Sequence, residues 1–189
     1  MSDAAETQTL DELLAIPDDT RLHELIGGRL VREAGPSGEH GDAQAGVVGA
    51  VRPRYQGPPG DGPGGWWIAT EVEVLLDGGD VARTDVGWRR ARVPARPTGA
   101  PVRARPDGVC EVLWPSHANV DTVEKLRLHH RAAIPHHWLA DPRDAPPTVM
   151  RWADAGCTTV QPAERGETLR PEPFDAVALP VGALFGDDG

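Results

Sequence analysis

The strongest constraint on the fold is the segment WWIATEVEVLLDGGDVARTDVGW, which covers residues 66–88. Its side chains alternate in character with a period of two, the pattern of an extended strand whose two faces meet different surroundings. The central DGGD supplies two glycines, and glycine tolerates the positive φ angles of a tight turn. The sequence therefore predicts an antiparallel hairpin, and the fold must contain a sheet built around it.

Capping and turn signals define the elements before this hairpin. TLDELLAI begins with Thr9, and Glu12 follows three residues later, a capping box that predicts a short helix. RLHELIGGRLVRE carries Gly27 and Gly28 between two apolar runs and predicts a second, smaller hairpin. Both elements lie in the first 33 residues, ahead of the main sheet strands.

A longer helix is predicted between the two hairpins. Ser37 can cap a helix that we expect to reach about Val51, with Pro53 ending it. GPPGDGPGG is a loop by composition. After the main hairpin, residues 89–106 hold four prolines and six arginines, which predicts an exposed basic loop.

The second half of the chain continues the alternation of strands and helices. An apolar strand is expected at about 108–114, closed by Pro115, and a helix from about Asn119 to Ala133. HHWLAD and TVMRWA predict two more strands, and the C-terminal segment a small strand pair and a short helical turn. The fold class is α/β (α+β), with a mixed central sheet flanked by helices. One domain is expected over 1–189, with 1–8 and 187–189 as flexible tails.

Charge and composition bound the function. The formal net charge of −10 argues against tight, nonspecific electrostatic binding of nucleic acid by the protein alone. No apolar stretch approaches the roughly 20 residues that span a membrane. The N-terminus lacks the pattern of a signal peptide, and the two cysteines form no CxxC motif. A cytoplasmic location is expected on these grounds.

Acidic side chains recur on the predicted strands, which is costly for a buried sheet unless the charges are paired or bind a cation. They are Glu24, Glu71, Glu73, Asp85 and Glu111. Two carboxylates on neighbouring strands and a main-chain carbonyl could hold Mg²⁺, which prefers oxygen ligands. Glu71 and Glu73 alternate with valines, so a solvated sheet face explains them equally well. Asp85 and Glu111 are flanked by apolar residues and are the stronger candidates.

The predicted helix after Glu111 carries Asp121, Lys125 and His129 at four-residue spacing, on one stripe. A lysine close to a metal site would stabilise charge that develops on a phosphoryl group. The same spacing is also that of an ordinary surface ion pair, which contributes about 0.2–0.5 kcal/mol to helix stability. Spacing alone favours the surface pair.

Several segments, taken in order, resemble the Uma-type family of restriction endonucleases, a branch of the PD-(D/E)XK nuclease superfamily. They are HELIGGRLV, GEH, ARTDVGW, CEVLWPSHANVDTVEKLRLHHRAAIPHHWLADP and ALPVGALF, and they extend over roughly residues 10–186. The resemblance implies a restriction-endonuclease-like fold and an endonuclease that depends on Mg²⁺ or Mn²⁺. It implies a nucleic acid substrate, with DNA favoured over RNA, and leaves a homodimer open.

The resemblance also implies roles for individual residues. Asp85 stands at the metal-binding aspartate, and Glu111 at the acidic residue of the (D/E)XK element. Leu113 occupies the position of the expected lysine, and Lys125 on the following helix matches it instead. Glu24 matches an early hairpin glutamate that could help to hold the metal or its water. The implied catalytic set is Asp85, Glu111, Lys125 and Glu24. Together with the argument from strand carboxylates and a main-chain carbonyl, the expected metal ligands are Asp85, Glu111, the Val112 carbonyl and Glu73.

Three alternatives compete with a nuclease. Thr84 and Trp114 depart from the family pattern, and Trp114 would crowd the metal strand, which favours a catalytically inactive binding or assembly module. Five of the seven histidines fall within 117–137 and raise a zinc site, but adjacent histidines point in different directions and no metal motif frames them. A serine hydrolase is disfavoured because no Gly-x-Ser-x-Gly motif occurs.

The arginines of 89–106 are candidates for contact with phosphate groups. Their alternative interpretation is a solvated, mobile loop.

Overall fold

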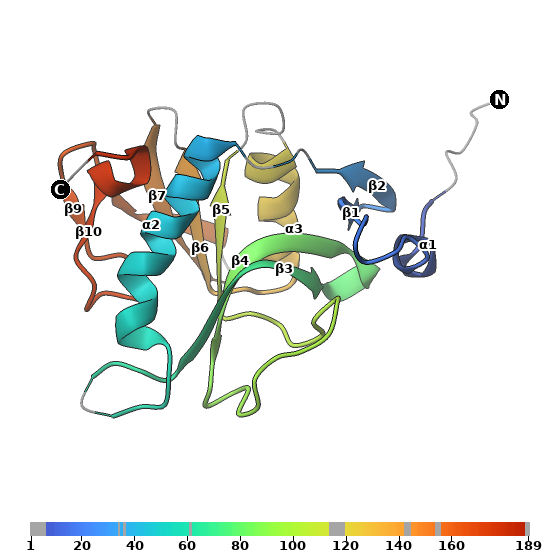
Figure 1. Ribbon diagram of the computed structural model, residues 1–189, viewed down its shortest axis with the longest axis horizontal. Coiled ribbons are helices and arrows are strands. Elements are labelled where there is room, and N and C mark those ends of the chain that lie inside the picture. Colours follow the sequence, from blue (N-terminus) through green and yellow to red (C-terminus); the bar gives the residue numbers. More distant parts are fainter. Residues whose placement is uncertain are drawn as a thin grey trace.

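The structure is a computed structural model that describes residues 7–33, 35, 37–60, 62–113, 120–141, 145–153 and 156–187. Its centre is an eight-stranded mixed sheet in the order β2-β1-β4-β5-β6-β7-β8, with β3 paired to β4 (Figure 1). The parallel pair is β5 with β6, and the other pairs in this sheet are antiparallel. The fold is therefore a mixed α+β architecture, which confirms the predicted class.

The strands of this sheet are β1 His23–Ile26, β2 Arg29–Arg32, β3 Trp66–Leu75, β4 Val81–Arg89, β5 Gly108–Val112, β6 His136–Asp141, β7 Ala145–Ala153 and β8 Gly156–Pro162. The α-helices are α1 Leu10–Leu14, α2 Gly38–Tyr55 and α3 Leu126–Arg131, and a π-helical segment, Val120–Lys125, leads into α3. Short 3-10 turns span Asp77–Gly79 and Val181–Phe185, and β9 Thr168–Leu169 pairs with β10 Leu179–Pro180.

Two apolar cores lie on opposite faces of the sheet. On one face α2 packs through Val47 and Val51 against Cys110 and the C-terminal segment. On the other face α3 packs through Leu128 against Val109. Successive residues of a strand point to opposite faces, so the neighbours Val109 and Cys110 serve the two cores separately. Any polar side chain on β5 is consequently directed at one helix or the other.

The N-terminal elements form as predicted and reach further than expected. The capping box of α1 is present, and β1 pairs with β2 across the Gly27-Gly28 turn. Gln8, which we placed in a flexible tail, donates its main-chain N–H to Gly28 O at 2.8 Å and accepts from Leu30 N at 2.6 Å. The tail predictions for residues 1–6 and 188–189 lie outside the described residues.

Helix α2 does not end at Pro53 but continues to Tyr55. Proline removes one main-chain hydrogen bond from a helix. The Tyr55 side chain is only 3% exposed, its ring meets that of Phe174 edge-on at 4.7 Å, and its hydroxyl accepts from Ala176 N at 3.0 Å. Burial of this aromatic ring offsets the lost bond, and a local helix-stop signal is overridden by tertiary packing.

The main hairpin is confirmed, with an irregularity that the alternating pattern did not predict. The register of β3 against β4 shifts between Ala69 and Val72, so that two residues of β3 lie opposite Asp85. One of these two, Glu71, has a φ of 53°. A positive φ is uncommon outside glycine, and a β-bulge is the usual place to find one beside a strand pair.

The segment 89–106 is anchored to the domain rather than being a mobile loop. Val102 donates its N–H to Glu73 O at 2.8 Å and accepts from Leu75 N at 2.9 Å, which adds a short bridge to the free edge of β3. Arg92 donates to Asp107, and the Arg90 guanidinium lies 3.4 Å from the Trp67 ring centroid. These arginines therefore have structural partners within the protein.

The elements around the opening of α3 differ in detail from the prediction. Strand β5 ends at Val112. Trp114, Pro115 and Asn119 lie outside the described residues. The expected helix begins as a π-helical segment at Val120 and becomes α-helical at Leu126. Within the described part of the chain, no helix is both long and apolar enough to cross a membrane.

Candidate active site

Strand β4 has an edge that is shared by two different partners. β1 pairs with it at Val81, and β5 pairs with it from Asp85 onward. Between these pairings Arg83 meets side chains instead of a strand. Its main-chain N–H donates to Glu24 Oε1 at 2.7 Å, and its carbonyl accepts from Lys125 Nζ at 3.2 Å. The two side chains thus substitute for strand pairing at the junction of β1, β4 and β5.

Lys125 is the centre of this polar cluster. Its Nζ lies 2.9 Å from Glu24 Oε1 and 3.3 Å from Glu111 Oε2, and the residue is only 4% exposed. Glu24 and Glu111 are buried as well. Removing such ions from water costs several kcal/mol each, which close pairing and hydrogen bonds must offset. The structure therefore brings together three of the four predicted catalytic residues in a desolvated ion cluster.

Two buried histidines lie behind Glu111. His129 Nε2 is 3.7 Å from Glu111 Oε1, and the rings of His129 and His137 meet edge-on at 5.1 Å. Burial lowers the pKa of His129 well below its ordinary value, and it lowers the pKa of His137 to about 4, with Lys125 adding to both effects. Both imidazoles are therefore neutral near neutral pH, and His129 meets Glu111 as a neutral group.

Asp85, the fourth predicted residue, is held by α2 and the β3 bulge. Its Oδ1 accepts from Gln44 Nε2 at 2.9 Å and from the main-chain N–H of Glu71 at 3.0 Å. Gln44 Nε2 also donates to Glu71 Oε1 at 2.7 Å. Asp85 is buried, and its immediate neighbours thus differ from those of Glu111.

The register of β4 and β5 bears on whether Asp85 and Glu111 can share one cation. Asp85 is paired with Cys110, so these two side chains point to the same face of the sheet. On a regular pleat the next residue, Glu111, points to the other face. Consistent with this, Asp85 contacts α2, whereas Glu111 contacts Lys125 at the start of α3. Among the described residues, no group of three or more Asp, Glu, His or Cys side chains is arranged to hold a metal ion. The shared ion remains a prediction.

The acidic groups around the cluster have altered proton affinities. Burial raises the pKa of Asp85 to about 6, and the nearby charge of Glu71 adds to this effect. The pKa of Glu33 is raised to about 8, because burial and the charge of Glu24 outweigh the attraction of Lys125 and Arg83. This holds although Glu33 contacts Arg83 Nη1 at 3.2 Å. Asp85 and Glu33 thus hold their protons more tightly than free carboxyl groups do, as expected of acids in a desolvated site with like charges nearby.

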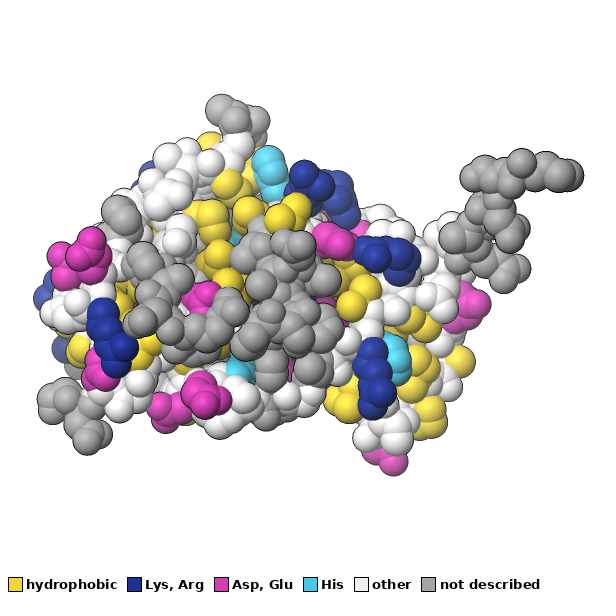
Figure 2. Space-filling model, turned by 90° about the horizontal axis from the view of Figure 1, so that it is seen from above, with side chains coloured by type: hydrophobic (Ala, Val, Ile, Leu, Met, Phe, Trp, Pro, Cys, Tyr) yellow, Lys and Arg dark blue, Asp and Glu magenta, His cyan; other side chains and the backbone are white. Residues whose placement is uncertain are grey.

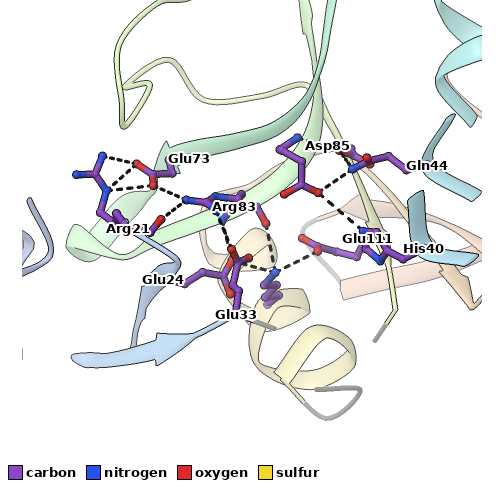
Figure 3. A network of polar contacts seen from close by, with 11 residues as sticks. Arg21, Glu24, Glu33, His40, Gln44, Glu73, Arg83, Asp85 and Glu111 are labelled. Carbon is purple, nitrogen blue, oxygen red and sulfur yellow. Dashed lines mark hydrogen bonds and ion pairs between the residues drawn. The ribbon is translucent and has the colours of Figure 1, made fainter. Parts of the chain in front are cut away.

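Glu73, which we expected among the metal ligands, belongs to a different network. Arg21 donates to both of its carboxylate oxygens, at 3.1 Å and 2.9 Å for the closest contacts, and Arg83 Nη2 donates to Oε1 at 2.7 Å (Figure 3). Arg21 is 2% exposed, and Glu73 is its buried carboxylate partner, while Arg21 Nη1 lies 2.6 Å from the exposed carboxylate of Asp18. Glu73 therefore serves as a buried counter-ion and does not join Asp85 or Glu111.

We expect Glu73→Gln to lower the free energy of unfolding by about 1.5–3 kcal/mol, because charge-assisted hydrogen bonds to two arginines are weakened. Any stabilisation by Mg²⁺ or Mn²⁺ should persist in this variant. Glu124→Gln is the matched control, since Glu124 pairs with Arg29 at the surface and such pairs contribute about 0–1 kcal/mol. Urea unfolding with and without cation measures both effects. Loss of the cation response in Glu73→Gln would return Glu73 to the metal site.

Several residues of the site were not predicted from the sequence. Gln44, Glu33 and the main chain of Arg83 carry no local signal, because their partners lie far away along the chain. One signal was available for Lys125, which is the single lysine among 18 arginines. A chain that uses arginine at every other basic position places its one compact ammonium group in this cluster. Asp121 and Trp114, which we linked to the site, have side chains outside the described residues.

The arrangement of the sheet and its helices is also found in a solved structure. One solved structure that superposes on the chain is described as a "putative nuclease belonging to DUF820 from Anabaena variabilis ATCC 29413". The TM-score is 0.74, at 18% sequence identity, and the alignment covers 94% of this chain and 97% of the other. At this identity the likeness establishes the fold.

The sequence itself matches a family over residues 10–182, namely Uma2, described as "Putative restriction endonuclease". Since the match extends over most of the chain, the protein belongs to the Uma2 family. Membership of a nuclease family implies a nucleic acid substrate. A comparison with curated proteins gives no match.

Proposed function

We propose that the protein is a nuclease that uses Mg²⁺ or Mn²⁺ to hydrolyse phosphodiester bonds, with DNA favoured over RNA as the substrate. The observation that carries this proposal is the position of Lys125, 4% exposed between Glu24 and Glu111 and bonded to the strand of Asp85. A buried ion cluster is weak evidence for stability and is therefore better explained by function. Membership of the Uma2 family supports the same conclusion.

The types of donor present suit a hard divalent cation. The available donors are carboxylate and carbonyl oxygens, the ligands that Mg²⁺ prefers, and burial has raised the pKa of Asp85. Asp85, Glu111 and the carbonyl of Val112 would hold the ion, and water or phosphate oxygens would supply its remaining ligands. When bound, such a cation neutralises charge on the phosphoryl group and lowers the pKa of a coordinated water.

The protein side chains have separate tasks in this proposal. Lys125 supplies a positive charge in a site of low dielectric, where it stabilises the negative charge that grows on a phosphoryl oxygen. Glu24 holds the ammonium group in place while it also binds the main chain of Arg83. Because Arg83 lies two residues before Asp85 on β4, Glu24 fixes the position of Lys125 relative to the metal-binding strand.

A second candidate is a nuclease fold that binds or assembles without catalysis. Two observations favour it, namely the net charge of −10 and the register that directs Asp85 and Glu111 toward different helices. Figure 2 shows acidic and basic side chains interspersed, without a continuous basic band on the described part of that face.

The experiment that separates the two candidates is cleavage by the purified protein. Supercoiled plasmid, linear duplex, single-stranded DNA and RNA are incubated with Mg²⁺, with Mn²⁺ or with chelator. We expect cation-dependent cleavage by the wild type and its loss, by a factor of about 100 or more, in Glu111→Gln. The variant removes one metal-binding charge while keeping a side chain of similar shape.

Glu164→Gln, at an exposed position remote in sequence from the cluster, is the control for contaminating nucleases and for charge alone. It should cleave like the wild type. Equal cleavage by all three proteins, or none by the wild type with either cation, would remove catalysis and leave the binding module.

A further inference from the structure

Helix α2 contacts the metal-binding strand through one amide side chain. Gln44 Nε2 lies 2.9 Å from Asp85 Oδ1 and 2.7 Å from Glu71 Oε1, so both of its N–H groups can be used on carboxylates. His40 lies one turn earlier on the same side of α2, with its Nε2 3.8 Å from Glu71 Oε1. One side of the helix is thus directed at the bulge of β3.

The bulge supplies the second contact to Asp85. In the bulge, two residues of β3 lie opposite the single residue Asp85 on β4. The positive φ of Glu71 turns its main-chain N–H toward Asp85 Oδ1, at 3.0 Å. Holding a glutamate in this region costs about 1 kcal/mol or more, and surrounding contacts must maintain it. The contacts of Gln44 and His40 with the Glu71 side chain provide that support.

These contacts divide the Asp85 carboxylate into two parts. Oδ1 accepts two hydrogen bonds, whereas Oδ2 accepts none from the described residues. We infer that Gln44 is a positioning residue, which together with the Glu71 N–H fixes the carboxylate so that Oδ2 faces the cation. The inference rests on the proposed function, because it assigns the groups that orient its metal ligand. Such partners typically change metal affinity by about 10–100-fold when they are removed.

The test uses thermal melts in chelator and across a series of Mg²⁺ and Mn²⁺ concentrations, so that no substrate or activity is needed. Gln44→Leu removes the amide at similar volume. We expect the cation concentration for a half-maximal rise in Tm to increase by about tenfold or more. Gln44→Glu places a third carboxylate against Asp85 and Glu71. It should melt below the wild type in chelator and gain more from the cation, because like charges repel until a cation is bound.

Gln56→Leu is the matched control for loss of an amide beside α2. Gln56 Oε1 accepts from Ile68 N on β3 at 2.8 Å, so the variant removes a contact between the helix end and β3 at another point, and its half-maximal cation concentration should stay within about threefold of the wild type. A wild-type midpoint that ignores both cations would overturn the proposed function and this inference together. A wild-type response that Gln44→Leu leaves unchanged would overturn the role of Gln44 alone, with the metal site retained.

Discussion

Replacement of Lys125 by methionine should both reduce cleavage strongly and lower the free energy of unfolding. Without the ammonium group, Glu24 and Glu111 would be buried next to each other with no charge between them, which costs about 3–5 kcal/mol. Lys125 acts on charge that grows in the transition state, so turnover should fall by about 100-fold or more even where the variant is folded. Cation binding should be largely intact. Urea unfolding and single-turnover cleavage at low temperature measure the two effects separately.

Two further variants separate charge from shape. Lys125→Arg keeps the positive charge but forces a longer, planar group into a buried space, so it should regain part of the stability and little of the turnover. Glu24→Gln combined with Lys125→Met removes one of the two buried carboxylates and should be more stable than Lys125→Met alone, while it remains inactive. Wild-type turnover in folded Lys125→Met would exclude Lys125 from the mechanism.

Asp85→Asn should be at least as stable as the wild type in chelator at neutral pH. Burial raises the Asp85 pKa from an ordinary value of 3.8 to about 6, so the folded state holds this proton more tightly than the unfolded state does. Wild-type stability therefore falls as the pH rises from about 4 to about 6, by roughly 3 kcal/mol for a shift of this size. The asparagine variant lacks this contribution, and its stability should depend less on pH in that range.

The same variant should lose its response to cations. A ligand that binds the folded state alone stabilises it by about 2.7 kcal/mol at a hundredfold excess over its Kd, and Asp85→Asn should lose most of this gain. Melts at several pH values, each with chelator and with Mg²⁺ or Mn²⁺, provide both comparisons. A variant that melts far below the wild type in chelator would show instead that Asp85 holds the β3 bulge through its contacts with Gln44 and Glu71.

The sequence predicted elements whose signals are local. The two hairpins follow from alternation and turn glycines, and α1 from its capping box, because strand period and capping act over a few residues. The bulge at Glu71 was missed because no glycine marks the positive φ. The end of α2 was predicted at Pro53 instead of Tyr55, because the burial of Tyr55 is a tertiary effect that no local pattern shows.

The candidate site likewise contains residues that the sequence could identify and contacts that it could not. Glu24, Glu111 and Lys125 could be named from the family resemblance, but no local pattern shows that Lys125 bonds to the main chain of Arg83. The ion pairs of Glu73 could not be predicted, because alternation reports which face a side chain occupies, not which charges it meets there. Its partners, Arg21 and Arg83, come from other elements, and only the fold reveals that they neutralise it.

The junction at Arg83 also sets when the site can exist during folding. Arg83 lies 59 residues after Glu24 and 42 residues before Lys125, so the cluster closes two long loops at once. Closing such loops costs entropy that is repaid only when the contacts at their ends form, which makes these contacts late events. A chain still emerging from the ribosome holds its carboxylates and its single lysine far apart. Under the proposed function, the site would become active only once the domain has folded, and a partly folded chain would not cleave nucleic acid.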